Sequence, residues 1–231
     1  MASFETKIQP LRNMNQIISY SMKTFIKDNS LISKGSANLA KILLSSLFLV
    51  SFLSGNAKEF KVIPASSTLA WEAKKVTGQH NGTIAIADGT LNVDHKKITG
   101  GKVSVDMNTI VDVDLTDAGY NQKLIGHLKS DDFFGVAKFP TATLEVKNVA
   151  AKSDNLYHFT ADLTIKGISS PVEFDAEVTE AGGQLTAAGS IVVNRTKYGI
   201  KYGSGSFFQG LGDKVIYDDF TLKFKLVSTA K

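Results

Sequence analysis

The chain has 231 residues, of which 43% are hydrophobic and 21% are charged, as in an ordinary globular protein. It has no cysteine, which excludes a disulfide framework, a thiolate nucleophile, an iron–sulfur cluster and a cysteine-ligated zinc. The net charge of +4 arises entirely within residues 1–57, and the rest of the chain has equal numbers of acids and bases. The balanced part shows no basic excess, so we expect no nucleic acid partner.

Residues 1–57 are predicted to be an N-terminal leader with a signal peptide. An apolar run of 12 residues at 42–53 follows Lys34 and Lys41, and the small residues Gly55 and Ala57 suit cleavage after Ala57. The run is short for a membrane span, which needs about 20 residues. An uncleaved anchor remains the alternative, and Met22 is an alternative start. We expect cleavage near Ala57 and a periplasmic or secreted domain over residues 58–231.

From residue 58 onward, apolar and polar residues alternate, which predicts strands with one apolar face each. We expect eight strands, in the segments 68–74, 83–93, 102–108, 142–147, 157–166, 172–179, 185–193 and 220–226. Turn signals between strands lie at Thr77-Gly78, Thr99-Gly100-Gly101, Ser153–Asn155, Gly167–Pro171 and Gly182-Gly183.

Asp88-Gly89 falls inside the second strand and is either a hairpin turn or a bulge. We favour the bulge, because it leaves eight strands.

Short turns between successive strands imply antiparallel neighbours, and one apolar face per strand allows a sandwich or a closed barrel. A closed barrel removes exposed edges, and eight strands enclose a space that side chains or one ligand can fill. We therefore predict an all-β fold, an eight-stranded antiparallel barrel. A short helical insertion is expected between its third and fourth strands, over Asp117–Phe134, with Ser130 capping a second short turn.

Four motifs follow one another along the chain. They are His127–Phe134 (His-Leu-Lys-Ser-Asp-Asp-Phe-Phe), Phe139-Pro140, Leu163–Gly167 (Leu-Thr-Ile-Lys-Gly) and Arg195–Gly199 (Arg-Thr-Lys-Tyr-Gly). In this order they resemble the YceI-like family of bacterial lipid-binding proteins, and the resemblance covers residues 68–227.

The resemblance implies a lipocalin-like extended barrel that holds a polyisoprenoid or similar long-chain amphiphile in its pore. It also implies export and no catalytic activity. Many members place an Arg-Asp pair just before the His-Leu, where this chain has the apolar Leu124-Ile125-Gly126. The polar contacts of that pair are therefore not expected here.

The predicted ligand-binding residues are apolar side chains on the inward faces of the strands. They are Leu69, Trp71, Val103, Val105, Met107, Leu144, Phe159, Leu163, Phe174, Ile191 and Leu222. The alternative is a solid core without a cavity, which periodicity does not distinguish from a pore.

Several residues near the predicted mouth have two interpretations each. Phe133 and Phe134 either gate the mouth or plug the barrel end. His127 either bonds a headgroup or orders its loop, and Arg195 either pairs an anionic headgroup or bonds backbone carbonyls and the Asp218-Asp219 pair. For the last two residues we favour the structural role.

Other functions lack support in the sequence. The four histidines, His80, His95, His127 and His158, are widely spaced, so neither a metal nor a cofactor is expected. No Gly-x-Ser-x-Gly element or acid–base pair stands out, so we do not expect an enzyme. The expected partner is a long-chain isoprenoid or fatty amphiphile, and a homodimer is compatible with the sequence.

The alternative function is a non-catalytic periplasmic stress-protective or interaction protein that uses the barrel as a scaffold. Its contact surface would then be the glycine-rich loop around Phe207 and Phe208.

Overall fold

The computed structural model describes residues 58–95 and 97–231. The predicted signal peptide and its cleavage site lie outside these residues. The described elements are β1 (Lys58–Val62), η2 (Pro64–Ser66), β2 (Thr68–Lys75), β3 (Gly78–Asp94), β4 (Lys97–Asp112), α3 (Ala118–Lys129), β5 (Thr141–Ala151), β6 (Leu156–Ile165), β7 (Ile168–Ala181), β8 (Gln184–Asn194), η3 (Arg195–Tyr198), η4 (Gly212–Lys214) and β9 (Ile216–Ala230).

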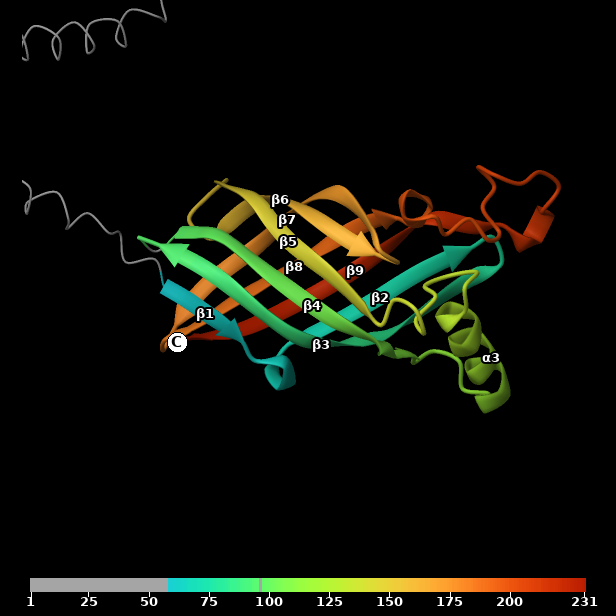
Figure 1. The fold of residues 1–231 in the computed structure, drawn as a ribbon, viewed down its shortest axis with the longest axis horizontal. Helices are drawn as coiled ribbons and strands as arrows, with labels where there is room; N and C mark the ends of the chain where they lie inside the picture. Colours follow the sequence, from blue (N-terminus) through green and yellow to red (C-terminus); the bar gives the residue numbers. More distant parts are fainter. Residues whose placement is uncertain (1–57, 96) are drawn as a thin grey trace, which may run out of the picture. The chain divides into compact units, whose positions relative to one another are not determined.

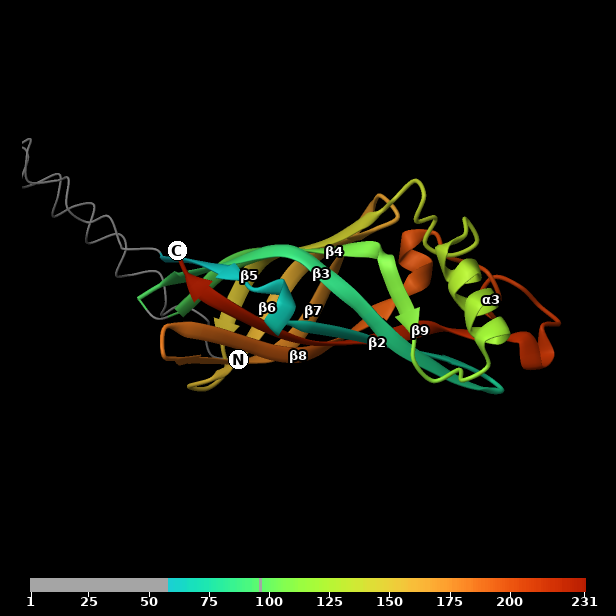
Figure 2. The ribbon, with the colours of Figure 1, turned by 90° about the horizontal axis from the view of Figure 1, so that it is seen from below.

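The strands form one closed antiparallel barrel (Figures 1 and 2). Strands β2 to β9 form a complete ring, because β3 pairs with β2 and β4, and β9 pairs with β8 and β2. The short β1 shares one place in the ring with β2, because both pair with β3 and β9, at different points along those strands. The predicted eight-stranded barrel is confirmed, although β1 was not predicted.

Two sequence interpretations around β3 and β4 have different outcomes. The bulge at Asp88-Gly89 is confirmed, because β3 runs unbroken through it and its register with β4 shifts between Ile86 and Asp88. The predicted turn at Thr99-Gly100-Gly101 is wrong, since these residues lie inside β4, where Gly100 and Gly101 pair with β3. The chain reverses at His95 instead, where φ is 47°. Glycine at position 101 avoids a clash with the neighbouring strand, because a Cβ atom would lie 2.6 Å from the carbonyl oxygen of Thr90.

The predicted turn Gly167–Pro171 is shorter in the structure. Lys166 and Gly167 alone connect β6 to β7, with φ angles of 53° and 74°. Positive φ at both central residues is typical of a type I′ hairpin turn, which matches the twist of the flanking strands. Pro171 therefore lies within β7, opposite Asp162.

The predicted helical insertion is present between β4 and β5 but ends earlier than expected. The side chain of Asp117 caps the N-terminus of α3 by accepting a hydrogen bond from the Tyr120 amide at 2.9 Å. Ser130 ends the helix, and the predicted second short turn follows it, with the Phe133 amide donating to the Ser130 carbonyl at 3.1 Å. The Ser130 hydroxyl does not cap this turn, because it donates back to the His127 carbonyl at 2.8 Å. Among the described residues, no helix combines the length and apolarity needed to cross a bilayer.

The two ends of the barrel differ. The end that holds β1 and the C-terminus of β9 is filled by packed apolar side chains, including Phe60, Val62, Tyr157 and Leu185. At the opposite end lie α3 and the segment between η3 and β9 (Figures 1 and 2). We call this the helix end. Because the other end is filled by packed side chains, any opening toward solvent is expected at the helix end.

Candidate functional site

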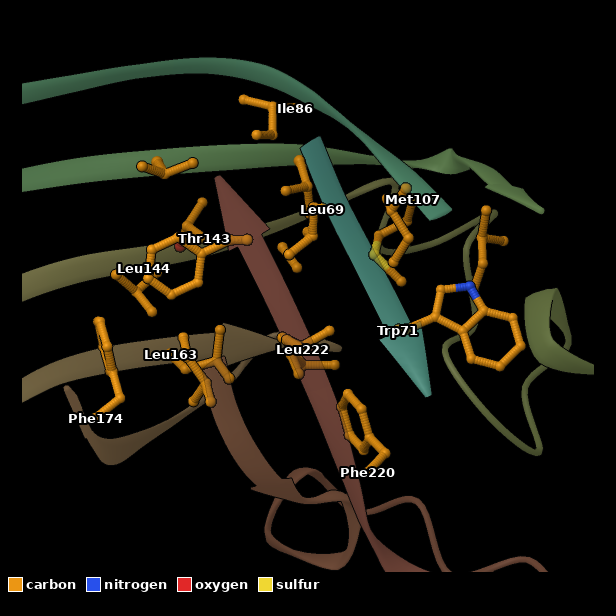
Figure 3. A pocket seen from close by; sticks show the side chains of 18 of the residues that line it. Leu69, Trp71, Ile86, Met107, Thr143, Leu144, Leu163, Phe174, Phe220 and Leu222 are labelled. Carbon is orange, nitrogen blue, oxygen red and sulfur yellow. The ribbon is translucent and has the colours of Figure 1, made fainter. Parts of the chain in front are cut away.

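An apolar cavity of about 170 Å³ lies inside the barrel (Figure 3). All eleven predicted pore residues line it: Leu69, Trp71, Val103, Val105, Met107, Leu144, Phe159, Leu163, Phe174, Ile191 and Leu222. They come from every strand of the ring except β3, which adds Ile84 and Ile86. A solid core without a cavity is therefore not what this chain forms, while contact of these side chains with a ligand stays a prediction.

The chemistry of the lining favours a hydrocarbon chain. Among the lining residues, the side chains with polar atoms are Trp71, Thr143, Arg195 and Tyr217. The Trp71 indole nitrogen is already used, because it donates to the Val111 carbonyl at 3.1 Å. A cavity needs only about 10–15 Å³ to admit one water-sized group, so this space is far above that minimum. An apolar space of that size stays dry and suits an alkyl or prenyl chain rather than a polar metabolite.

A row of aromatic rings forms one wall of the cavity. Phe159 and Phe174 stack with their centroids 5.2 Å apart, and Phe224 meets Phe174 edge-on at 5.7 Å. These rings come from the adjacent strands β6 and β7 and from β9. Aromatic pairs in such geometries gain energy beyond simple burial, so this wall is expected to be rigid.

Phe133 and Phe134 lie at the helix end of the cavity. Both line it, and Phe133 is buried at 7% exposure. Phe134 packs edge-on against Phe220, with 6.4 Å between ring centroids. The pair therefore lies at the helix end of the cavity, and whether it gates the mouth or plugs the barrel end stays a prediction.

His127 orders the loop that follows α3. Its Nε2 atom lies 3.2 Å from a carboxylate oxygen of Asp132, and its ring packs edge-on against Phe133 at 4.8 Å. The same ring packs against Tyr202, with 4.5 Å between the ring centroids. This contact joins the loop to residues 199–211, the glycine-rich segment that follows η3. These contacts support the structural interpretation of His127.

Arg195 lines the cavity, but its guanidinium is held by backbone carbonyls. Its guanidinium donates to the carbonyls of Tyr217, Ile200 and Ile216 at 3.1, 3.0 and 2.9 Å, and to Asp218 at 3.3 Å. Burial lowers the pKa of Arg195, and the charge of Asp218 opposes that effect. Because most of its donors are already used, we assign Arg195 to fixing the chain around η3 and the start of β9.

Asp218 completes this arrangement. Its second carboxylate oxygen accepts a hydrogen bond from the Ser206 hydroxyl at 2.6 Å. Burial acts to raise the pKa of Asp218, but the hydroxyls of Ser204 and Ser206 and the charge of Arg195 outweigh it, so the pKa is lowered. The carboxylate is therefore ionised at neutral pH and ties the glycine-rich segment to β9.

The glycine-rich segment lies at the helix end, where Tyr202 reaches Phe133. Its Phe207 and Phe208 side chains are half exposed, at 49% and 50%. The ammonium of Lys201 sits 4.5 Å from the centre of the Phe207 ring. These rings face outward and do not line the cavity.

The comparisons with known proteins agree with this geometry. The family model described as "YceI-like domain" matches residues 60–228. The chain is 37% identical over 101 residues to "Protein YceI" of Escherichia coli O17:K52:H18, and 37% identical over 95 residues to a "UPF0312 protein" of Shewanella denitrificans. These matches cover 44% and 41% of this chain, and about half the length of each relative, 50% and 47%.

Two solved structures share the fold. Burkholderia cenocepacia BcnA matches with a TM-score of 0.59 and 24% identity, over 73% of this chain and 99% of that one. A polyisoprenoid binding domain from Saccharophagus degradans matches with a TM-score of 0.56 and 15% identity, over 74% of this chain and 98% of that one. Likeness at these identities speaks for the fold alone. Since the family model covers most of the chain, the protein belongs to the family defined by the YceI-like domain.

Proposed function

We propose that this protein carries or stores a long-chain isoprenoid or related fatty amphiphile in its barrel, without catalysing a reaction. The observation that carries this proposal is the apolar cavity inside the barrel, to which every strand of the ring contributes. Burial of a hydrocarbon chain there would stabilise the complex by about 25 cal/mol for each Å² of apolar surface removed from water. The Saccharophagus degradans domain with the same fold is described as polyisoprenoid binding, which supports this class of ligand.

The lipid is expected to enter tail first from the helix end. The other end is filled by buried side chains such as Phe60 and Val62. At the helix end, Phe133 and Phe134 form the barrier, and their displacement would open a path into the cavity. The headgroup would then remain near the loop of His127, in contact with solvent.

The lack of carboxylate and imidazole groups in the cavity lining supports a binding role. The described residues that line the cavity include no carboxylate and no imidazole. General acid–base catalysis needs such a group within hydrogen-bond reach of the reacting atoms. A lipid held in this cavity would therefore be protected rather than transformed.

Export is part of the proposal. The leader 1–57 carries a basic flank, an apolar run and small residues before a cleavage site at Ala57. Mass spectrometry of the protein recovered from the periplasm or medium of expressing bacteria would test it. A mass that starts at Lys58 is expected, whereas a mass that retains the apolar run would contradict cleavage.

A second candidate is the scaffold or interaction role. The half-exposed Phe207 and Phe208 favour it, because large apolar side chains on a surface often mark contacts with other molecules. The cavity supports the lipid proposal instead, because a scaffold has no need of one.

Trp71 offers a direct test, since it is the single tryptophan of the chain and lines the cavity. The full chain, freed of lipid by organic extraction, would be titrated with farnesol while tryptophan emission is followed. We expect a change in emission that saturates at one farnesol per chain. Emission that stays unchanged up to the solubility limit of farnesol would contradict the proposal.

A further inference from the structure

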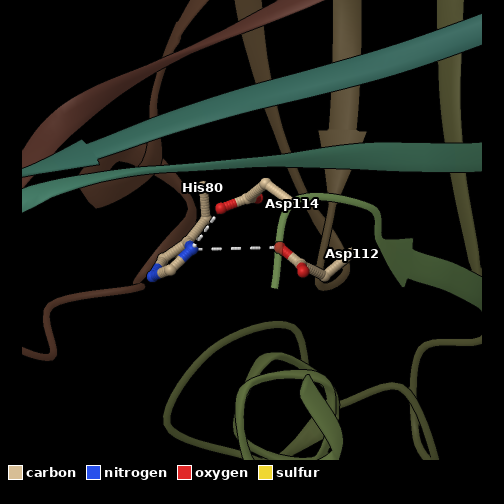
Figure 4. Close-up of side chains that lie close together, drawn as sticks. All are labelled: His80, Asp112 and Asp114. Carbon is tan, nitrogen blue, oxygen red and sulfur yellow. Dashed lines mark hydrogen bonds and ion pairs between the residues drawn. The ribbon is translucent and has the colours of Figure 1, made fainter. Parts of the chain in front are cut away.

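Three polar side chains meet near the base of α3, away from the cavity lining (Figure 4). His80 belongs to β3, Asp112 is the last residue of β4, and Asp114 lies in the segment that leads to α3. The His80 Nδ1 atom is 3.0 Å from an oxygen of Asp114 and 3.9 Å from Oδ2 of Asp112. The three candidate ligand atoms lie within 4.8 Å of one another.

One oxygen of this cluster is buried without a partner. The Asp112 side chain has 0% exposure. Its Oδ1 atom accepts hydrogen bonds from the Leu115 amide at 2.9 Å and the Asn121 side chain at 3.2 Å. Its Oδ2 atom, which faces His80, has no hydrogen-bond partner among the described residues. A buried carboxylate oxygen left in this way is costly, and a cation bound there would relieve that cost.

We propose that His80, Asp112 and Asp114 bind a divalent transition-metal cation of the zinc class. Imidazole nitrogen and carboxylate oxygen bind such ions at about 2.0–2.2 Å, so two ligand atoms up to about 4.2 Å apart can share one ion. The two separations from His80, 3.0 and 3.9 Å, meet this condition. The two carboxylates are bounded only by 4.8 Å, so a small rotation of the more exposed Asp114 would accompany binding. The imidazole makes zinc or a similar metal the better fit, because magnesium and calcium prefer oxygen ligands alone.

The surroundings allow the ion to arrive from solvent. The side chains of His80 and Asp114 are 24% and 30% exposed, while Asp112 forms the buried floor. Three protein ligands leave at least one coordination position for water. The Asn81 amide donates to the other oxygen of Asp114 at 2.7 Å, which orients that carboxylate.

The site would connect the barrel wall to the helix. Asn121 of α3 donates to the carbonyls of both Asp112 and Leu115 at 3.2 Å, so the helix already depends on this segment. An ion bound by β3, β4 and the segment of Asp114 would fix the base of α3. This inference concerns groups outside the cavity lining and does not depend on lipid binding.

The test is calorimetric titration of the chelator-treated full chain with zinc sulfate. We expect one zinc per chain, and affinity at least tenfold weaker in the His80→Gln variant. His158→Gln is the matched control, because His158 also lies between acids, 2.8 Å from Asp175 and 3.9 Å from Glu173, but on an exposed strand face. It should leave zinc binding unchanged. Absence of binding by the wild-type chain, or binding that His80→Gln does not weaken, would overturn the proposal.

A second measurement needs no variant, in case His80→Gln fails to fold. Paramagnetic Co²⁺ would be added to the wild-type chain while backbone amide signals are followed by NMR. Signals of Asn81 and Leu115 should be among the first to broaden, because both amides bond to the proposed ligands. Broadening confined to other parts of the protein would overturn the assignment of the site.

Discussion

At the scale of single residues, Arg195 illustrates how the hydrogen-bond donors of a charged side chain can be used to hold the backbone rather than a ligand. A family motif led to the expectation of a structural or headgroup role, and the hydrogen bonds to three carbonyls support the structural one. Its planar fork matches several acceptors at once, which a lysine ammonium does not. The motif alone could not decide this, because the carbonyl acceptors come from segments more than 20 residues away along the chain as well as from Ile200.

Replacement of Arg195 by lysine should therefore destabilise the protein despite conserving the charge. We expect a loss of about 2–4 kcal/mol, because at least two carbonyls, buried or partly buried, lose their partners. The free energy of unfolding from urea denaturation measures this. Lys197→Arg, the reverse exchange at an exposed position of the same η3 helix, is the control and should change little. Equal stability of the two variants would contradict the assigned role.

Asp218 should make stability depend on pH in the acidic range. Its pKa in the folded protein lies below the usual 3.8. The stabilisation it provides is thus fully present above pH 3.8 and is lost as the pH falls through the folded-state value. The difference in unfolding free energy between the wild type and Asp218→Asn should be largest near neutral pH and shrink in acid. A difference independent of pH would contradict this account.

At the scale of elements, alternation predicted the strands of the ring because each has one buried and one exposed face. The turn at Thr99–Gly101 was misassigned because glycine also serves close contacts inside paired strands. β1 was not predicted because its five residues are too few to show a clear alternation. Its extended structure depends on pairing with β3 and β9. Alternation of apolar and polar residues thus predicts strands long enough to show it. It does not predict a short strand such as β1, which forms through pairing with distant segments.

Gly82 shows the closest approach of a neighbouring strand to a glycine, and this approach leads to a prediction. It pairs with Trp71 on one side and Asp112 on the other, and a Cβ atom would lie 1.8 Å from the carbonyl oxygen of Val111. Gly82→Ala should destabilise the protein by about 3 kcal/mol or more, because strand backbones must separate. Thermal unfolding measures this change.

Gly126→Ala is the matched control for that substitution. Gly126 lies inside α3, and an added Cβ atom would meet nothing within 4 Å. The change should stabilise the protein by about 0.5–1 kcal/mol, because alanine favours helix. Similar melting temperatures for the two variants would contradict the close approach at Gly82.

At the scale of the whole molecule, the cavity wall followed from strand periodicity together with the family motifs. The same sequence reasoning missed the cluster of His80, Asp112 and Asp114, since no short spacing relates residues on different strands. Their meeting follows from the pairing of Gly82 with Asp112, which only the barrel register reveals. Sequence pattern thus predicted the cavity wall, while polar clusters between strands required the structure.

A matched pair on β8 tests whether the cavity holds the ligand. Ala187 lines the cavity, and the adjacent Ala188 does not. Ala187→Phe should weaken farnesol binding at least tenfold by filling the space, at a cost in stability of about 1–3 kcal/mol. Ala188→Phe adds the same side chain beside it and should leave binding unchanged. Equal affinities of the two variants, measured by Trp71 emission, would place the lipid elsewhere.

Native mass spectrometry of the protein purified from expressing bacteria, followed by organic extraction, tests the central claim most directly. We predict a stoichiometric adduct that extracts as an isoprenoid or fatty amphiphile. A bare protein mass that stays unchanged after incubation with long-chain lipids would contradict the claim and favour the scaffold role.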